Sequence, residues 1–270
     1  MEIAGYIASL VIGISLGLIG GGGSILTVPV LVYLFRIQPV IATAYSLFIV
    51  GSTSLVGSYP KYKLGQINLK TALIFGIPSI AAVYATRAFI VPAIPENIFT
   101  VGNLVVTKSL LMMILFAVLM VFASVSMIRD KKEPVEEEGE QKFNYPFILL
   151  EGLVVGTLTG LVGAGGGFLI IPALVLLSKL PMQQAVGTSL LIIAVNSLIG
   201  FTGNPGKEAM NWSLLFTVTG LAIVGIFIGN KLSGKVSAGR LKKGFGWFVL
   251  VMGIYIIVKE LFFPGTGGGH

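Results

Sequence analysis

The stretch GLIGGGGS, residues 17–24, recurs 143 residues later as GLVGAGGG, residues 160–167. The similarity extends beyond the glycines, because residues 13–57 align with residues 156–200 without a gap and about two-fifths of the aligned positions are identical. A run of glycines therefore interrupts an apolar stretch at the same place in each half. Two related halves with such breaks are typical of a secondary transporter, whose substrate site lies where the repeats meet.

The composition indicates a protein that crosses a membrane several times. Of the 270 residues, 55% are hydrophobic and 11% are charged, whereas soluble domains carry about 25% charged residues. The mean hydropathy of +0.95 is typical of a chain whose apolar surface is covered by lipid. The sequence has no cysteine, which excludes disulfides, thiolate metal sites and cysteine nucleophiles. We interpret the net charge of +7 as membrane orientation and contact with anionic lipid, not nucleic-acid binding.

Apolar stretches divide the chain into two repeats. We predict an all-α polytopic membrane protein with a first transmembrane repeat at residues 1–128, a charged cytoplasmic linker at 129–145 and a second repeat at 146–264. We interpret residues 265–270, which end in the single histidine His270, as an appended tail without function. The predicted helices follow the apolar stretches at about 3–19, 24–36, 40–59, 70–91, 105–128, 147–163, 167–178, 183–203, 212–231 and 245–263.

Each repeat is expected to begin with a glycine-broken helical hairpin and to continue with three transmembrane helices. A single helix over residues 3–36 would be about 50 Å long, whereas the hydrocarbon core is about 30 Å thick. Consecutive glycines favour a sharp turn, because glycine loses the most entropy in a helix. We therefore predict hairpins at residues 3–36 and 147–178, and the sequence leaves open whether they are re-entrant or fully spanning.

The basic residues predict opposite orientations for the two halves. Lysine and arginine cluster near residues 61–70, in the linker and near residues 231–243. Placing these three segments in the cytoplasm satisfies the positive-inside rule, with about 13 basic residues inside and about 5 outside. Each half then crosses the membrane an odd number of times, so the repeats have inverted topology and both termini lie outside the cytoplasm. Arg87, near the end of its span, is interpreted as an interfacial, snorkelling side chain.

The two glycine-rich turns are the first candidate binding site. A helix that begins after a turn presents free N–H groups and a positive end, and bare glycine lets an anion approach that backbone. Two such turns could cradle a small oxyanion without any arginine or lysine, and tight helix packing is the alternative role for small residues. A nucleotide-binding loop is disfavoured because its lysine is missing. The candidate substrate-binding residues of the turns are Gly20, Gly21, Gly22, Gly23, Ser24, Gly163, Gly165, Gly166 and Gly167.

Polar side chains on the helices after the hairpins are the second candidates. A spacing of seven residues places Ser46 and Thr53 near one helix face, and Ser189 and Asn196 near the corresponding face of the second repeat. Together with Thr188, these groups could donate hydrogen bonds to a substrate that has lost its water. Interhelical hydrogen bonding is the alternative reading of the same residues.

The doubled motif also carries a resemblance to a known family. Each glycine run is followed by a proline and then by an Ala-x-x-x-Ser segment, at Ala42–Ser46 and at Ala185–Ser189. This pattern resembles the TauE/SafE family of sulfite and organosulfonate exporters, also called the 4-toluene sulfonate uptake permease family, over nearly the full chain. The resemblance implies that the substrates are small sulfur-containing anions such as sulfite or sulfoacetate, moved across a prokaryotic inner membrane, in a direction that it leaves open.

We therefore predict a carrier, not an enzyme, in which the inverted halves rock around the two turns and expose the site alternately to each side. No cofactor or metal is expected. The expected partners are the anionic substrate and membrane lipid, and a homo-oligomer stays open. No carboxylate lies in the middle of a predicted span, and Glu151 is interpreted as an interfacial anchor. Proton coupling stays open: it is absent, uses a protonatable substrate or involves Glu151. The alternative is a transporter or channel for another small anion or for a cation, although a cation site would need carboxylates or carbonyl rings in the spans.

Overall fold

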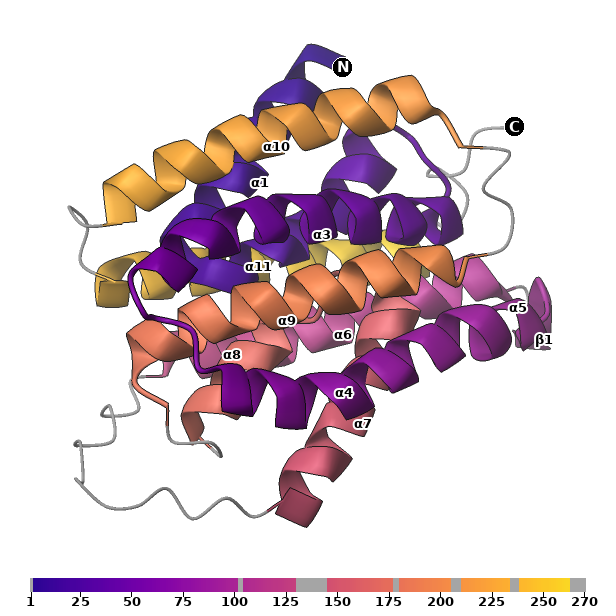
Figure 1. Cartoon of the computed structure of the whole chain (residues 1–270). Helices are drawn as coiled ribbons and strands as arrows, with labels where there is room; N and C mark the ends of the chain where they lie inside the picture. Colours follow the sequence, from indigo (N-terminus) through magenta and orange to yellow (C-terminus); the bar gives the residue numbers. More distant parts are fainter. Residues whose placement is uncertain are drawn as a thin grey trace.

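The computed structural model describes residues 2–101, 104–129, 145–176, 180–204, 210–233 and 238–262. Residues 130–144 of the predicted linker and the predicted tail lie outside the described residues. The described chain is a bundle of helices (Figure 1). Its elements in chain order are α1 (Glu2–Ile19), η1 (Gly20–Leu26), α2 (Thr27–Pro29), η2 (Val30–Leu34), α3 (Pro39–Lys63), α4 (Leu69–Ala85), η3 (Thr86–Ile90), α5 (Val91–Ala93), β1 (Asn97–Val101), β2 (Leu104–Thr107), α6 (Lys108–Ile128), α7 (Tyr145–Val162), α8 (Gly167–Leu176), α9 (Met182–Thr202), α10 (Trp212–Ser233) and α11 (Ala238–Phe262).

Local sequence signals explain where several helices begin. Asn68 precedes α4, and its side-chain oxygen accepts a hydrogen bond from the Thr71 amide at 3.0 Å. Thr107 precedes α6 and accepts in the same way from the Leu110 amide at 3.2 Å. Both side chains satisfy an amide that has no partner within its helix. Pro39 opens α3, where its fixed φ suits the first turn and its missing N–H is not needed.

Five helices in the described part of the chain are long and apolar enough to cross a membrane: Pro39–Lys63, Leu69–Ala93, Lys108–Ile128, Met182–Thr202 and Trp212–Ser233. Shorter apolar helices cover Ile3–Ile19, Gly23–Leu34 and Pro146–Val162. Large apolar side chains such as Phe122, Trp247 and Phe262 are exposed on the outside of the bundle. A lipid-facing surface requires such an exterior. The chain is a multi-pass, predominantly helical membrane protein, as its composition predicts.

A short β-hairpin is an exception to the predicted all-α fold. Strands β1 and β2 pair antiparallel between α5 and α6, with Asn97 opposite Thr107 and Phe99 opposite Val106. The two strands are rich in valine, isoleucine and threonine, which favour extended backbone. The predicted helix at 105–128 therefore begins three residues later, at Lys108.

Helices α3 and α9 lie side by side at the centre of the bundle (Figure 1). A Cβ on Gly51 of α3 would lie 2.9 Å from Leu198 of α9, and one on Gly200 of α9 would lie 3.5 Å from Leu47 of α3. Residue numbers thus rise along one helix as they fall along the other, so the two helices are antiparallel. Helices α3 and α9 are the corresponding helices of the two aligned segments.

The first helix of each half packs on a helix of the other half. Helix α1 lies along α10, and a Cβ on Gly13 would collide with the Ala222 backbone. Helix α7 lies along α4, and a Cβ on Gly156 would collide with the Ser79 backbone. The two contacts are equivalent in the repeat, because Gly156 follows Gly13 and Ala222 follows Ser79 by the same 143 residues. Glycine at these positions lets the helix backbones approach closely, as small residues do in membrane bundles.

The chain turns back on itself at the first glycine run, as the hairpin prediction requires. The rings of Tyr6 and Phe35 meet edge to face with centroids 5.4 Å apart. A Cβ on Gly23 would lie 2.5 Å from the Leu16 amide nitrogen. The segment after the glycines therefore returns along α1. It covers a core of buried apolar side chains that includes Leu16 and Val28.

Candidate functional site

The first glycine run forms a tight helical turn. Gly20–Leu26 make up the 3₁₀ helix η1, which also contains Gly22. Ser24 lies inside η1, and its hydroxyl donates to the Gly21 carbonyl at 2.7 Å, while the apolar helix that was predicted to begin at Ser24 covers Gly23–Leu34. In the second half the expected arrangement holds, since α8 begins at Gly167. The two turns therefore differ in structure although their sequences correspond.

Several of these glycines adopt a backbone conformation that other residues avoid. The φ angles are +72° at Gly20, +74° at Gly163, +68° at Gly165 and +70° at Gly166. A side chain in this left-handed region collides with its own backbone, at about 1–2 kcal/mol for most residues. Glycine is thus needed in both turns for conformational reasons alone, and more often in the second turn than in the first.

The first turn lies along α9 of the other half. A Cβ on Gly20 would lie 2.7 Å from Val186, and one on Gly21 would collide with Ile193. Ser189 lies between these two α9 residues on the same helix face. Its hydroxyl donates to the Val186 carbonyl at 2.8 Å. The structure thus places Ser189 beside the first turn, although its one proton is used within its own helix.

The second turn lies along α3 in a corresponding way. A Cβ on Gly163 would collide with Thr43, and one on Gly165 would lie 2.7 Å from Val50. Ser46 lies between these residues on the same face of α3. It is fully buried, and its hydroxyl has no hydrogen-bond partner. A buried hydroxyl without a hydrogen bond lowers the stability of the folded state, and a bound substrate could supply the missing partner. Ser46 therefore remains a candidate substrate-binding residue.

The two turns also touch each other. A Cβ on Gly21 would lie 2.6 Å from the Gly167 Cα, and a Cβ on Gly167 would collide with the Gly21 backbone. The structure therefore brings the duplicated motifs together, far apart as they are in sequence. Backbone contact of this kind accounts for glycine at positions 21 and 167 by packing alone. Gly23 and Gly166 pack inside their own halves, against Leu16 and Thr159 respectively.

Other candidates on the central helices have different surroundings. Thr53 is fully buried on α3, and its hydroxyl is unpaired. Thr188 accepts a hydrogen bond from the Asn68 amide at 2.9 Å, so it joins α9 to the residue that caps α4. Glu151 lies in α7, twelve residues before Gly163, which corresponds to about 18 Å along a helix. One of its carboxylate oxygens is buried without a partner, but the structure does not bring Glu151 to the turns.

Asn196 donates to a serine on a neighbouring helix. Its side-chain nitrogen lies 2.6 Å from the Ser79 hydroxyl on α4, and both residues are fully buried. The Asn196 amide oxygen has no partner. This arrangement realises the interhelical hydrogen bond that the sequence left as an alternative, and it leaves one acceptor free.

Breaking this hydrogen bond should destabilise the bundle. Replacing Ser79 with alanine leaves a buried amide group unpaired, at an expected cost of about 1–3 kcal/mol in the free energy of unfolding. A double-mutant cycle of Ser79→Ala and Asn196→Ala, followed by thermal unfolding in detergent, should give a coupling of about 0.6–1.7 kcal/mol. Thr157→Ala removes an exposed hydroxyl that bonds only within α7 and serves as the control. A coupling of zero would show that the two side chains do not interact.

Arg87 is a residue that the sequence reasoning misplaced. The prediction that it snorkels to the interface is wrong, because it is 0% exposed and among the largest fully buried side chains. It lies in the π-helical turn η3, and such turns are frequent at functional sites. Burial of a charged guanidinium costs several kcal/mol unless its donors are matched. A useful signal was present in the repeat, because Arg87 corresponds to Asn230, a second polar residue within a span.

The donors of Arg87 are only partly used. Its Nη1 donates to the Thr43 hydroxyl at 3.0 Å and to the Asn204 side-chain oxygen at 3.2 Å. Nε and Nη2 are buried and have no hydrogen-bond partner among the residues that the structure describes. A Cβ on Gly163 would lie 2.7 Å from Nη2, so the guanidinium adjoins the second glycine turn. The site is thus more positive than the uncharged cradle predicted from the sequence.

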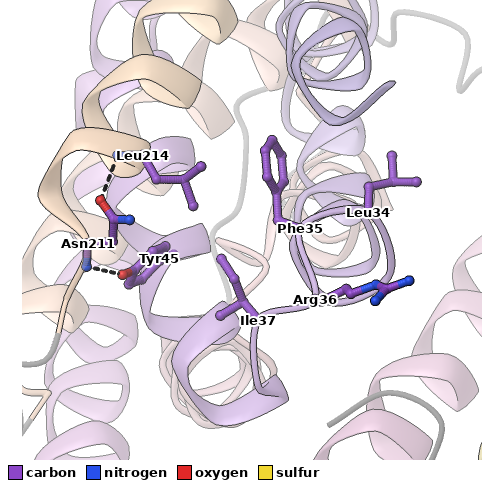
Figure 2. Close-up of a pocket in the computed structure, with 7 residues that line it drawn as sticks. All are labelled: Leu34, Phe35, Arg36, Ile37, Tyr45, Asn211 and Leu214. Carbon is purple, nitrogen blue, oxygen red and sulfur yellow. Dashed lines mark hydrogen bonds between the residues drawn. The ribbon is translucent and has the colours of Figure 1, made fainter. Parts of the chain in front are cut away.

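A cavity of about 430 Å³ opens at the N-terminal end of α3. It lies between the end of the first hairpin and the start of α10, where Tyr45 accepts a hydrogen bond from the Asn211 amide (Figure 2). Figure 2 shows the Arg36 side chain pointing away from Tyr45 and Asn211. Tyr45 is two residues from Thr43, so the cavity and Arg87 lie at the same end of α3. The lining residues are Leu34, Phe35, Arg36, Ile37, Tyr45, Asn211 and Leu214.

Comparison with known proteins gives one family over nearly the whole chain. The family described as Sulfite exporter TauE/SafE matches residues 6–256. A probable membrane transporter protein of Xylella fastidiosa is 30% identical over 92% of each chain. The probable membrane transporter protein YunE of Bacillus subtilis is 27% identical, over 94% of this chain and 95% of its own. A similar protein of Methanocaldococcus jannaschii is 26% identical, over 93% and 94% respectively. No solved structure matches the chain.

Proposed function

Because this chain belongs to the sulfite exporter TauE/SafE family, we propose that it is a secondary transporter that moves small sulfur-containing anions, such as sulfite or sulfoacetate, across a prokaryotic inner membrane. The observation that carries the proposal is the meeting of the two glycine turns. Each turn lies along the central helix of the opposite half, and the turns touch at Gly21 and Gly167. A site built from both halves is what an alternating-access carrier needs.

The proposed binding shell combines backbone and side-chain donors. The N–H groups of the second turn, which lead into α8 at Gly167, would face the anion's oxygens. The hydroxyls of Ser46 and Thr53 on α3 are buried and unpaired, so they have a proton to donate. Ser189 and Asn196 would contribute from α9, the antiparallel counterpart of α3. Glu151, with a buried unpaired oxygen, is the proposed coupling residue if transport moves a proton.

The antiparallel arrangement of α3 and α9 supports a rocking mechanism. In the proposed cycle the two halves, inverted in the membrane with both termini outside, change their tilt around the contact between the turns. Helices α1 and α7, which pack on the opposite half, would move with the partner helix that each one touches. The substrate would thus be exposed first on one side and then on the other.

Transport by the purified protein tests the proposal. In proteoliposomes, an outward or inward gradient of labelled sulfite should drive saturable flux that protein-free liposomes lack. Binding should also raise the unfolding temperature, since a ligand at 100 times its Kd stabilises the folded state by about 2.7 kcal/mol. The panel for this thermal assay is sulfite, sulfate, thiosulfate, sulfoacetate and taurine. Flux of a cation, with no effect of any panel anion, would contradict the proposal.

A further inference from the structure

We infer that Arg87 binds the transported oxyanion directly, at a site formed by the N-terminal end of α3, the turn η3, the C-terminal end of α9 and the second glycine turn. The inference rests on the proposed transport function and deepens it, because it names the charged group and the chemical class that this group selects. The cradle predicted from the sequence consisted of uncharged backbone amides. In the inferred site, the Arg87 guanidinium binds the substrate and the glycine backbone lies around it.

The free nitrogens of Arg87 are the ones that suit an oxyanion. Nε–H and one N–H of Nη2 point along the same edge of the planar guanidinium, and this edge can donate two parallel hydrogen bonds. These are the two nitrogens without a partner, whereas Nη1 is already used. The side chain is fully buried. The vacant edge therefore matches two oxygens bound to one central atom, as in sulfite or a sulfonate.

The acceptors of Nη1 hold the guanidinium in place and are themselves uncharged groups. The Thr43 hydroxyl donates its own proton to the Val40 carbonyl at 2.7 Å, so it can only accept from Arg87. The Asn204 amide nitrogen donates to the carbonyls of Gly200 and Phe201, each at 3.3 Å, which turns its oxygen toward Arg87. Both acceptors are neutral. Local hydrogen bonds to groups without charge thus fix the orientation of the guanidinium.

Glycine at position 163 leaves room for the Nη2 end of the guanidinium. A Cβ there would lie 2.7 Å from Nη2 and would also collide with Thr43. The corresponding place in the first half differs, because Gly20 faces Val186 where Gly163 faces Thr43, and the counterpart of Arg87 is Asn230. Only one of the two repeat-related sites therefore carries a positive charge. We expect one oxyanion per chain.

Sulfite titration of Arg87 variants in a neutral detergent tests the inference. Arg87→Gln removes the charge and the fork, and we expect its sulfite affinity to fall by about 100-fold or more. Arg87→Lys keeps the positive charge but loses the two parallel donors of the guanidinium, and we expect its sulfite affinity to fall by about tenfold. Arg129→Gln removes an equal charge from an exposed residue at the end of α6 and should bind like the wild type. Chloride has no oxygen atoms to accept two parallel hydrogen bonds, so it should compete poorly with sulfite in the wild type.

The outcomes separate this inference from the proposed function. If the wild type binds sulfite and both Arg87 variants bind it equally well, the inference is wrong and sulfite transport stands. If no sulfur anion binds but nitrate or acetate raises the unfolding temperature of the wild type and not of the variants, the inference stands and the proposed substrate is wrong. If Arg87→Gln does not fold, unchanged affinity in Arg87→Lys overturns the inference. The last outcome is that only phosphatidylglycerol vesicles raise the unfolding temperature, and that they do so in the wild type but not in the Arg87 variants. The ligand of Arg87 is then a lipid phosphate, and the inference is wrong.

Discussion

Replacing Gly167 with alanine is expected to lower the free energy of unfolding by about 3 kcal/mol or more, an effect at the upper end of those for overpacked cores. The added Cβ would collide with backbone atoms of Gly21, which cannot turn away as the end of a flexible side chain can. Gly21→Ala should have a similar effect, because its Cβ would lie 2.6 Å from the Gly167 Cα and would collide with Ile193. Thermal unfolding of the purified protein in detergent measures both effects.

Gly220→Ala is the matched control for this prediction. Gly220 lies in α10, and a Cβ there would have nothing within 4 Å. Alanine is the better helix former by about 1 kcal/mol, so this substitution should be neutral or stabilising. If Gly167→Ala unfolds at the wild-type temperature, the two turns are not in contact in the folded protein.

Replacing Gly165 with valine is expected to abolish anion transport while the protein remains folded. The valine would occupy the space between the second turn and α3, with its Cβ 2.7 Å from Val50 and 3.0 Å from the Ser197 hydroxyl. It would also have to adopt a φ of +68°, which is strained for a β-branched residue. Flux of labelled sulfite in proteoliposomes measures transport, and size-exclusion chromatography shows whether the protein is folded. The same result is expected for Gly22→Val, at the corresponding position of the first turn.

Gly65 provides a control for backbone strain. Its φ is +67°, nearly that of Gly165, but it lies in the loop between α3 and α4 and a Cβ there would have nothing within 4 Å. Gly65→Val thus introduces the same strain without filling the proposed site, and it should retain transport. Wild-type flux in Gly165→Val would show that the turn does not bind substrate. Equal loss in both valine variants would attribute the effect to strain.

The positions of the helices were predictable because a bilayer leaves the sequence few choices. A span needs about 20 apolar residues and its backbone must be hydrogen-bonded internally, so apolar stretches and helices coincide. The stretch predicted at 183–203 is α9, Met182–Thr202. Segments that do not span the bilayer were harder to predict. Strands β1 and β2, for example, are only five and four residues long. The 3₁₀ conformation of η1 was not predicted either, and η1 packs against α1, α8 and α9, which its local sequence does not contain.

The candidate site was predictable where the repeat marked it and unpredictable where tertiary contacts decide. Duplication pointed to both glycine turns, yet the contact of Gly21 with Gly167 joins segments 146 residues apart. Arg87 shows the opposite case. A basic residue near the end of an apolar stretch can point outward to the headgroups or inward to the bundle, and the sequence of its own helix is compatible with both. Its inward orientation depends on acceptors at Thr43 of α3 and at Asn204, just after the end of α9.

Helix α1 packs on α10 and helix α7 packs on α4. During synthesis, therefore, the first helix of each half waits a different time for its packing partner. Helix α1 leaves the ribosome first, but α10 follows roughly 200 residues later, which at about 5–20 residues per second is a wait of about 10–40 s. During that time the glycines of α1 that contact α10 in the folded protein lack this partner. Helix α7, by contrast, finds α4 already made when it emerges. The second half can therefore assemble on the first as it is translated, whereas the first half is completed only by the second.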